Sequence, residues 1–494
     1  MATIEGEKSA AVTIETLSSV PQECHYADES TLEPPPDLTE EEERKLWRKV
    51  DLRLMPILSL MQLCSFLDRG NAKLQGLVSQ LHLVGNEYNI ALTMYFIPYA
   101  LFECPANLVL KKLRPSRWLP GITITWGIIM TLMGLIKSYQ QLVGIRICLG
   151  IAEAGLFPGV IYYLTFWYPR HMLQYRVGLF WGAATVSGAF SGLLAFGISF
   201  MSGTEGMLGW SWIFILEGIG TVLVGVVAAF VLVDFPATAK FLTPRERAFI
   251  VDKQKYDISS VGEEERFAFR YIWAAFKDWQ VLMLCLINLS VIGPLYGISL
   301  FLPFGYSTAV SQLLTVPPYV FATIVLLIMA VWSDRIKKRS PFIFVGLIMS
   351  FIGFLINITD APVGVKYLGT FFCVGGCYSA FTGVVSWLSN NLAGQYKRAV
   401  GVALQIGMGG FAGAIASNMY RTQDAPRYVL GHGLELMLVG LGLICVPLTV
   451  LNYIRINAQR DTAQKEMMEG GRVKYSAEEL KEMGDKSPDF RYTI

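Results

Sequence analysis

The chain has 494 residues, of which 53% are hydrophobic and only 16% are charged, and its mean hydropathy is +0.44. A soluble protein cannot bury so large an apolar surface, so this composition indicates a membrane protein. The formal net charge of +2, with no separate basic domain, argues against nucleic-acid binding.

The first 45 residues are rich in Ser, Thr and Glu and end in the run LEPPPDLTEEEERK. This polar composition predicts a disordered, cytoplasmic tail over residues 1–45. The segment lacks a basic start followed by an apolar stretch, so we expect no cleavable signal peptide. The first membrane span would then direct insertion.

Twelve apolar runs follow, centred near residues 60, 98, 127, 155, 187, 223, 291, 322, 349, 378, 408 and 443. Each is long enough to cross the hydrocarbon core as a helix. The sequence therefore predicts an all-α membrane protein with twelve transmembrane helices in two six-helix halves, over residues 46–233 and 279–456. The charged segment 234–278 would be a cytoplasmic linker and 457–494 a cytoplasmic tail, a layout typical of transporters built from two repeats.

The orientation follows from the loops between these runs. If the spans alternate, the basic loops all fall on one side of the membrane, at residues 111–117, 168–176, 333–340 and 395–398. The opposite loops hold almost no Lys or Arg. Because basic loops stay inside, both termini are expected in the cytoplasm.

Ionisable residues inside the spans are costly, so they usually face a cavity or one another. The first half contains several of them, namely Asp68, Arg69, Glu103, Arg146, Glu153 and Glu217. The second half has only Glu435 and otherwise neutral polar groups, namely Asn288, Tyr296, Tyr378, Asn390, Asn391, Gln405 and Asn418. Charge-dependent chemistry is therefore expected in the first half and neutral contacts in the second.

Arg146 and Glu153 are seven residues apart and share one helix face, about 10 Å apart along the axis. An acid and a base along a cavity wall could pass a proton between partners. The alternative is that each forms a structural ion pair with a neighbouring helix.

The adjacent Asp68 and Arg69 end the first apolar run, and Gly70 follows them. Their alternative interpretation is a solvated helix end. Glu103 lies one residue before Cys104-Pro105, and Glu217 lies near the start of the sixth span. Both are more typical of structural than of catalytic residues.

Several stretches resemble the major facilitator superfamily, namely LDRGNA, YALFECPANLVLKK, RICLGIAEAGLFPG and GWSWIFILEG in the first half. Later stretches resemble its anion:cation symporter family, in the fungal branch of allantoate and vitamin permeases that includes nicotinate permeases. These stretches are AVWSDRIKKRSPFI, WLSNNLAG, DAPRYVLGHG and DKSPDFRY. The resemblance covers nearly the whole chain after residue 45 and implies the twelve-helix major facilitator fold.

The resemblance also implies roles for the charged residues. Asp68 and Glu153 would carry the coupled proton, while Arg69 and Arg146 would bind the substrate anion or partner the acids. These assignments follow from the position of each residue within its motif.

Two further positions follow from the resemblance. Tyr99 matches a substrate-contacting tyrosine, and Gln405 falls near a polar substrate contact. Ala184 stands where sugar-acid transporters of the family have a Gln, which favours a flatter or more apolar acid over a polyhydroxylated one.

The superfamily's loop signature is an Asp-Arg followed by basic residues. The loop between spans two and three, NLVLKKLRPSR, has lost the Asp, but the equivalent loop in the second half keeps it. Gating or structural roles are therefore implied for Asp334, Arg335 and Arg339, and we expect such roles for Glu103 and Glu217 as well.

The leading interpretation is a proton-coupled symporter of a small organic anion, a nicotinate-like or other vitamin-type monocarboxylate, that works by alternating access. One alternative is efflux of an organic acid or secondary metabolite on the same fold. Another is a protein that senses a solute without transporting it. Such sensors carry long cytoplasmic extensions, and the predicted tails of this chain, 1–45 and 457–494, argue against this alternative.

We expect no enzymatic activity, cofactor or metal. The four histidines, at positions 25, 82, 171 and 432, lie scattered without metal-binding spacing or a nucleophile nearby. The expected partners are the substrate anion, protons and the lipid bilayer. The protein is expected to be a monomer in the plasma membrane.

Overall fold

The structure, a computed structural model, describes residues 38–67, 76–257, 269–300, 308–420, 428–469 and 483–494. The predictions for Asp68, for Arg69 and for residues 1–37 lie outside these ranges.

The first half consists of one short and seven longer helices. They are α1 (Glu40–Leu67), α2 (Leu77–Gln80), α3 (Glu87–Lys112), α4 (Pro115–Met133), α5 (Tyr139–Glu153), α6 (Leu156–Trp167), α7 (Leu173–Ser199) and α8 (Gly209–Val231). Two helices follow in the predicted linker, α9 (Pro244–Asp257) and α10 (Phe269–Phe276).

The second half consists of six long helices. They are α11 (Trp279–Leu300), α12 (Thr308–Ile336), α13 (Ser340–Ile358), α14 (Val363–Asn391), α15 (Gln395–Ala416) and α16 (Val429–Glu469). Eleven of the twelve predicted centres fall within long helices, and the one near residue 155 falls at the junction of α5 and α6, which together form the fourth span. Nine spans of the described chain are long and apolar enough to cross a membrane by length and composition alone. The predicted all-helical architecture is confirmed.

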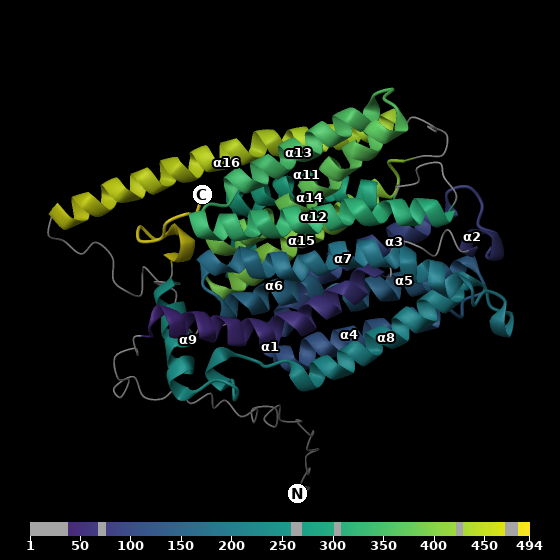
Figure 1. The fold of residues 1–494 in the computed structure, drawn as a ribbon. Coiled ribbons are helices and arrows are strands. Elements are labelled where there is room, and N and C mark those ends of the chain that lie inside the picture. Colours follow the sequence, from purple (N-terminus) through teal and green to yellow (C-terminus); the bar gives the residue numbers. More distant parts are fainter. Residues whose placement is uncertain (1–37, 68–75, 258–268, 301–307, 421–427, 470–482) are drawn as a thin grey trace, which may run out of the picture.

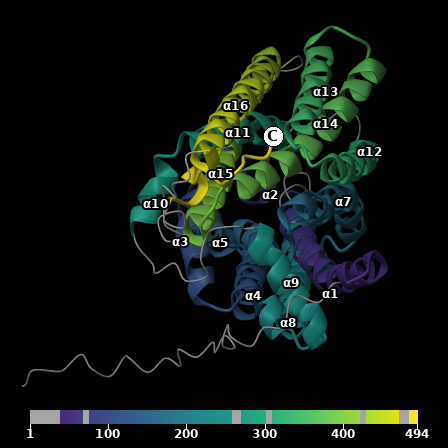
Figure 2. The same cartoon turned by 90° about the vertical axis from the view of Figure 1, so that its left-hand side faces the viewer.

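The long helices run side by side along one direction (Figure 1). Seen from one end, the helices of the first half gather in the lower part of the bundle and those of the second half in the upper part (Figure 2). We call the end that carries α9 and the C-terminal residues the α9 end, and the opposite end, which carries α2, the α2 end.

The two halves meet through close helix pairs, α3 with α15 and α7 with α12. Glycine permits both approaches: a Cβ at Gly413 would lie 2.6 Å from the Phe96 ring, and a Cβ at Gly188 would lie 2.8 Å from the Tyr319 ring. Small residues in membrane helices allow such close packing.

Helix α1 begins earlier than the sequence composition indicated. Thr39 and Glu42 form a capping box, in which the Thr39 backbone N–H donates to Glu42 Oε2 at 2.9 Å and the Glu42 N–H donates to Thr39 Oγ1 at 3.3 Å. This reciprocal pair satisfies N–H groups at the helix start. Residues 40–45, predicted as part of the disordered tail, are therefore helical.

The predicted linker is also partly ordered. Helix α9 lies against the start of α1, where Lys49 pairs with Glu246 at 2.8 Å and Lys253 pairs with Glu43. At the other end of the chain, α16 continues to Glu469, beyond the predicted span end at 456, because no Pro or Gly interrupts it there.

The fourth span is broken at its centre, between α5 and α6. Pro158 has no N–H to donate to the carbonyl of Ala154, so the regular helix cannot continue through this turn. Glu153 is the last residue of α5 and therefore lies at the break.

Candidate functional site in the central cavity

A narrow cavity lies where the two halves meet. The first half lines it with Gln62, Ser65, Phe66, Tyr99, Glu153, Leu156, Phe157 and Trp181. The second half lines it with Asn288, Ile292, Tyr296, Phe381, Ile406, Gly409 and Gly410. Its volume of about 30 Å³ has room for one or two water molecules but not for an organic ligand. The described side chains of the two halves thus approach one another closely at this site.

Glu153 is the one carboxylate among the described lining residues, and it is 3% exposed. Ser65 on α1 donates a hydrogen bond to Glu153 Oε1 at 2.5 Å, and Tyr95 on α3 donates to Oε2 at 2.5 Å. Hydroxyl donors stabilise a carboxylate. Helices α1 and α3 therefore help to position this acid, which is carried by α5.

The cavity walls are mainly aromatic. The Trp181 ring lies 4.2 Å from that of Phe381, 5.0 Å from that of Phe66 and 5.1 Å from that of Phe157, measured between ring centroids. Phe381 comes from the second half and the other three from the first. Aromatic faces from both halves thus enclose the space beside Glu153.

A few neutral polar atoms complete the site. Within the described part of the chain, Trp181 Nε1, Asn288 Oδ1 and Gln62 Oε1 are buried and have no hydrogen-bond partner. Buried polar atoms are normally satisfied, so a donor and acceptors in a cavity are available to a bound solute or water.

Tyr99 and Glu153 line the cavity as the sequence predicted, but Arg146 does not. Arg146 is buried on α5 about 10 Å from Glu153 along the axis, toward the α2 end. Its guanidinium lies 5.9 Å from the Phe214 ring centroid and interacts electrostatically with Tyr88. Arg146 is therefore not among the residues that line this cavity, and its binding of the anion or of the acids stays a prediction.

Gln405 is also outside the cavity lining. Its side-chain Nε2 donates to the backbone carbonyl oxygens of Leu284 and Val384, each at 3.3 Å. The backbone carbonyl of Gln405 accepts from Asn288 Nδ2 at 2.6 Å. The side chain thus ties α15 to α11 and α14. The next residue along α15, Ile406, faces the cavity instead, because successive helix positions point in different directions.

The two other predicted glutamates lie within helix interfaces. Glu103 is fully buried on α3, where a Cβ at Gly407 on α15 would lie 2.9 Å from Glu103 Oε2. Glu217 is buried on α8 and does not line the cavity. Their placement fits the structural roles that we expected.

Asp334 and Arg339 join the two halves at the α9 end. They pair with each other; Asp334 accepts from the Tyr175 backbone N–H at 2.7 Å, and Arg339 donates to the Arg170 carbonyl at 2.9 Å. Arg335 lies beside Asp334 in sequence but is exposed in the last turn of α12, and the contacts of Asp334 and Arg339 described above do not include it. Its gating or structural role stays a prediction.

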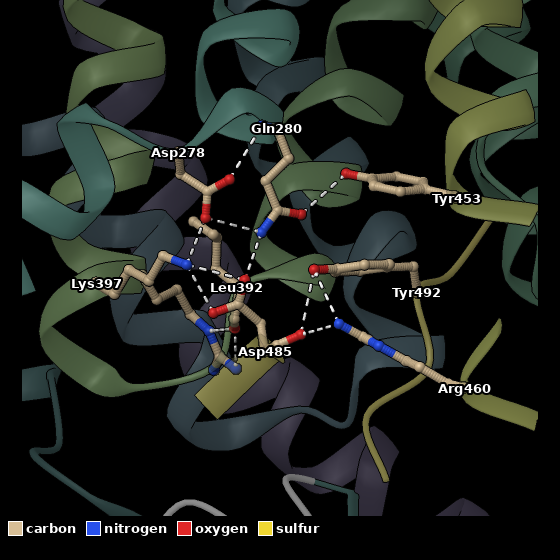
Figure 3. Close-up of polar contacts among 9 residues, drawn as sticks. Asp278, Gln280, Leu392, Lys397, Tyr453, Arg460, Asp485 and Tyr492 are labelled. Carbon is tan, nitrogen blue, oxygen red and sulfur yellow. Dashed lines mark hydrogen bonds and ion pairs between the residues drawn. The ribbon is translucent and has the colours of Figure 1, made fainter. Parts of the chain in front are cut away.

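A second charged cluster lies at the α9 end within the second half (Figure 3). The Lys397 ammonium lies between two carboxylates, 2.5 Å from Asp278 and 2.6 Å from Asp485. Gln280 Nε2 donates to Asp485 at 2.6 Å, and Tyr453 donates to Gln280 at 3.2 Å. Burial raises the pKa of Asp485 above its usual value, while Lys397 opposes this effect.

Asp485 belongs to the C-terminal segment, residues 483–494, which packs across this end of the bundle. Tyr492 stacks on Tyr453 with ring centroids 4.6 Å apart, and Arg460 donates to the Asp485 carbonyl at 2.8 Å (Figure 3). The Arg170 guanidinium of the first half lies 4.5 Å from the Phe490 ring centroid. The segment predicted as a tail is thus docked and reaches both halves.

Comparison with known proteins assigns this fold to a family. Residues 58–417 match the family model described as Major Facilitator Superfamily. The chain belongs to the major facilitator superfamily. It is therefore a transporter rather than an enzyme, and a multi-pass membrane protein.

Other members of the superfamily align over most of their length. The MFS-type transporter cnsO of Penicillium expansum is 35% identical, covering 91% of this chain and 90% of its own. The major facilitator-type transporter hxnP of Emericella nidulans is 31% identical, covering 92% and 94%. The E. coli xylose transporter XylE aligns with a TM-score of 0.59 over 82% of this chain and 95% of its own, and its 16% identity supports the fold alone.

The sequence analysis missed residues that position Glu153 or surround it. Tyr95 and Ser65 hold the carboxylate, and Trp181 forms the wall beside it. Tyr95 lies one turn before Tyr99 on the same face of α3, and this spacing could have identified it. Ser65 and Trp181 carry no such signal.

Proposed function

We propose that this superfamily member is a proton-coupled symporter of a small organic anion, in the anion:cation symporter family. The two halves, residues 46–233 and 279–456, would alternate the exposure of the central cavity. The observation that carries the proposal is Glu153, a buried carboxylate in an aromatic cavity at the junction of the halves.

Glu153 is suited to bind and release a proton. Ser65 and Tyr95 donate to it through hydroxyl groups, which can hydrogen-bond to either the charged or the neutral acid. Opening the cavity to water favours the carboxylate, and closing it over a solute favours the neutral acid. The protonation state would thereby depend on the conformation and on the bound anion. Asp68 remains our second candidate for carrying the proton.

The cavity chemistry favours a flat monocarboxylate such as a nicotinate-like vitamin. The rings of Trp181, Phe381 and Phe157 offer stacking surfaces, and Trp181 Nε1 offers a donor for a ring nitrogen or a carboxylate oxygen. Ala184 is small and buried where a Gln would add a polar group. Arg69 remains the candidate that recognises the carboxylate, because Arg can bind it through two parallel hydrogen bonds.

We further propose that the α9 end faces the cytoplasm, with both termini on that side, and that the protein is a monomer in the plasma membrane. The basic loops support this orientation. Cotransport of a proton with a monovalent anion neutralises the charge, so import would not oppose an inside-negative membrane potential.

Uptake of labelled carboxylates by yeast cells that lack their own permeases tests the proposal. We expect accumulation of labelled nicotinate or a related monocarboxylate at acidic external pH, abolished by a protonophore, and no accumulation of nicotinamide. Equal uptake of the acid and its amide would contradict anion selectivity. Accumulation that is insensitive to the protonophore would contradict proton coupling, and substrate loss from preloaded cells alone would favour efflux.

A further inference from the structure

A second buried carboxylate, Glu435, lies in the second half on α16. Its side chain is fully buried, and neither of its oxygens has a hydrogen-bond partner within the described residues. The site lies toward the α2 end, apart from the central cavity lining. An isolated carboxylate ion is strongly disfavoured in such surroundings.

The Glu435 carboxyl fits against the backbone of α11. A Cβ at Gly297 would lie 1.9 Å from Glu435 Oε1, so only glycine leaves the carboxyl its place. The same helix faces repeat this close packing, because a Cβ at Gly293 would lie 2.8 Å from the Leu438 side chain. Helix α16 thus places the Glu435 carboxyl directly against the backbone of α11.

The opposite face of α11 forms part of the central cavity. Ile292 and Tyr296 line that cavity, whereas Gly293 and Gly297, one position further along, face α16. Pro294 interrupts the hydrogen-bond ladder of α11 between these residues. A movement of α11 that opens the cavity would therefore alter the packing around Glu435.

Among the described residues, the other titratable groups that interact with Glu435 carry no fixed charge. Cys373 and Cys377 of α14 and Tyr420 after α15 interact with it electrostatically. His432 lies one turn earlier on α16, and its Nδ1 is 3.1 Å from the Tyr420 hydroxyl. Lys366 of α14 acts on His432 from further away. Helix α13 contributes the neutral Asn357 beside Cys373.

We propose that Glu435 is a second proton-binding site, which holds a proton while α11 packs on α16 and releases it when the two helices separate. This goes beyond the proposed function, which places the coupled proton on Glu153 and Asp68. The Tyr420–His432 pair lies between the carboxyl and the α2 end and is placed to pass the proton in that direction. Because the site is outside the cavity, it can respond to conformation without touching the substrate.

Infrared spectroscopy of the purified full-length protein in lipid nanodiscs tests this directly, without a substrate. A protonated carboxylic acid has its own carbonyl stretching band. We expect such a band at neutral pH in the wild type and in Glu153→Gln, and its loss in Glu435→Gln, which keeps the shape of the side chain. Identical spectra for the wild type and Glu435→Gln would overturn the proposal.

Gly297→Ala tests the link to helix separation, with Gly293→Ala as the matched control at the same interface. The added Cβ of Gly297→Ala must displace the carboxyl, whereas that of Gly293→Ala meets only the flexible end of Leu438. We expect the band to disappear at a lower pH in Gly297→Ala than in Gly293→Ala. An equal pH dependence in the two variants would contradict the proposed release. If nicotinate is not transported, only the substrate assignment fails, because these spectra do not depend on it.

Discussion

The central cavity and the cluster at the α9 end both bury charge, but they do so differently. At the α9 end, Lys397 is paired with two carboxylates and Arg339 with Asp334. In the cavity, Glu153 accepts hydrogen bonds from the hydroxyl groups of Ser65 and Tyr95. A charge in a buried ion pair resists a change of protonation, because the change leaves its partner unpaired, whereas a hydroxyl group can hydrogen-bond to an acid in either protonation state. The first arrangement suits the locking of a fold and the second suits coupling to protons.

The largest effect is expected from Glu153→Gln in the cavity. The amide keeps the size of the side chain but cannot carry a proton, so accumulation of labelled substrate against its gradient should be lost. Exchange of internal for external substrate should remain, and thermal unfolding should change little. The control is Glu246→Gln at the exposed end of α9, for which normal accumulation is expected. Accumulation by Glu153→Gln at the wild-type level would show that Glu153 does not couple transport to protons.

Lys397→Ala should mainly lower the stability of the protein, whereas Glu153→Gln should mainly affect transport. Removing the ammonium leaves Asp278 and Asp485 buried without their positive partner, which costs about 3–5 kcal/mol of stability. Thermal unfolding of the detergent-purified protein should occur at a clearly lower temperature, and addition of Asp485→Asn should recover part of the loss. A stability equal to the wild type would show that this cluster does not lock the fold.

These two regions differ in how far the sequence alone could predict them. The spans could be predicted, because a membrane requires long apolar runs whatever their packing. Glu153 could be predicted as well, because a charge inside such a run is costly. The directions in which the side chains of Arg146, Gln405 and Arg335 point could not be predicted, because they depend on how each helix is rotated and on which helices lie beside it. The docked segment around Asp485 depends on contacts far apart in sequence, and its polar composition resembles that of a tail.

Tyr95→Phe should produce an intermediate effect. The change removes the hydroxyl that donates to Glu153 and leaves the ring. Because this hydroxyl helps to position the carboxylate, its loss should reduce accumulation of labelled substrate to a level between those of the wild type and Glu153→Gln. Accumulation equal to that of the wild type would show that Tyr95 is not needed to position this acid.

The smallest effect is expected from Arg335→Ala, with Arg339→Ala as its counterpart. Arg335 is exposed, so its loss should change stability by no more than about 0.5 kcal/mol. Arg339 is fully buried against Asp334, and its loss should destabilise the protein by several-fold more. Unfolding curves of the two variants measured together check this. Equal destabilisation by the two substitutions would contradict the finding that Arg335 is exposed and Arg339 is buried.

Proton movement in proteoliposomes shows whether Glu153 carries the coupled proton. A pH-sensitive dye would report the pH of the external medium when labelled nicotinate, or the best substrate of the uptake panel, is added. We expect substrate-dependent alkalinisation with the wild type and none with Glu153→Gln, although the variant still exchanges substrate. Alkalinisation of equal size with Glu153→Gln, or wild-type transport without any proton movement, would contradict this expectation.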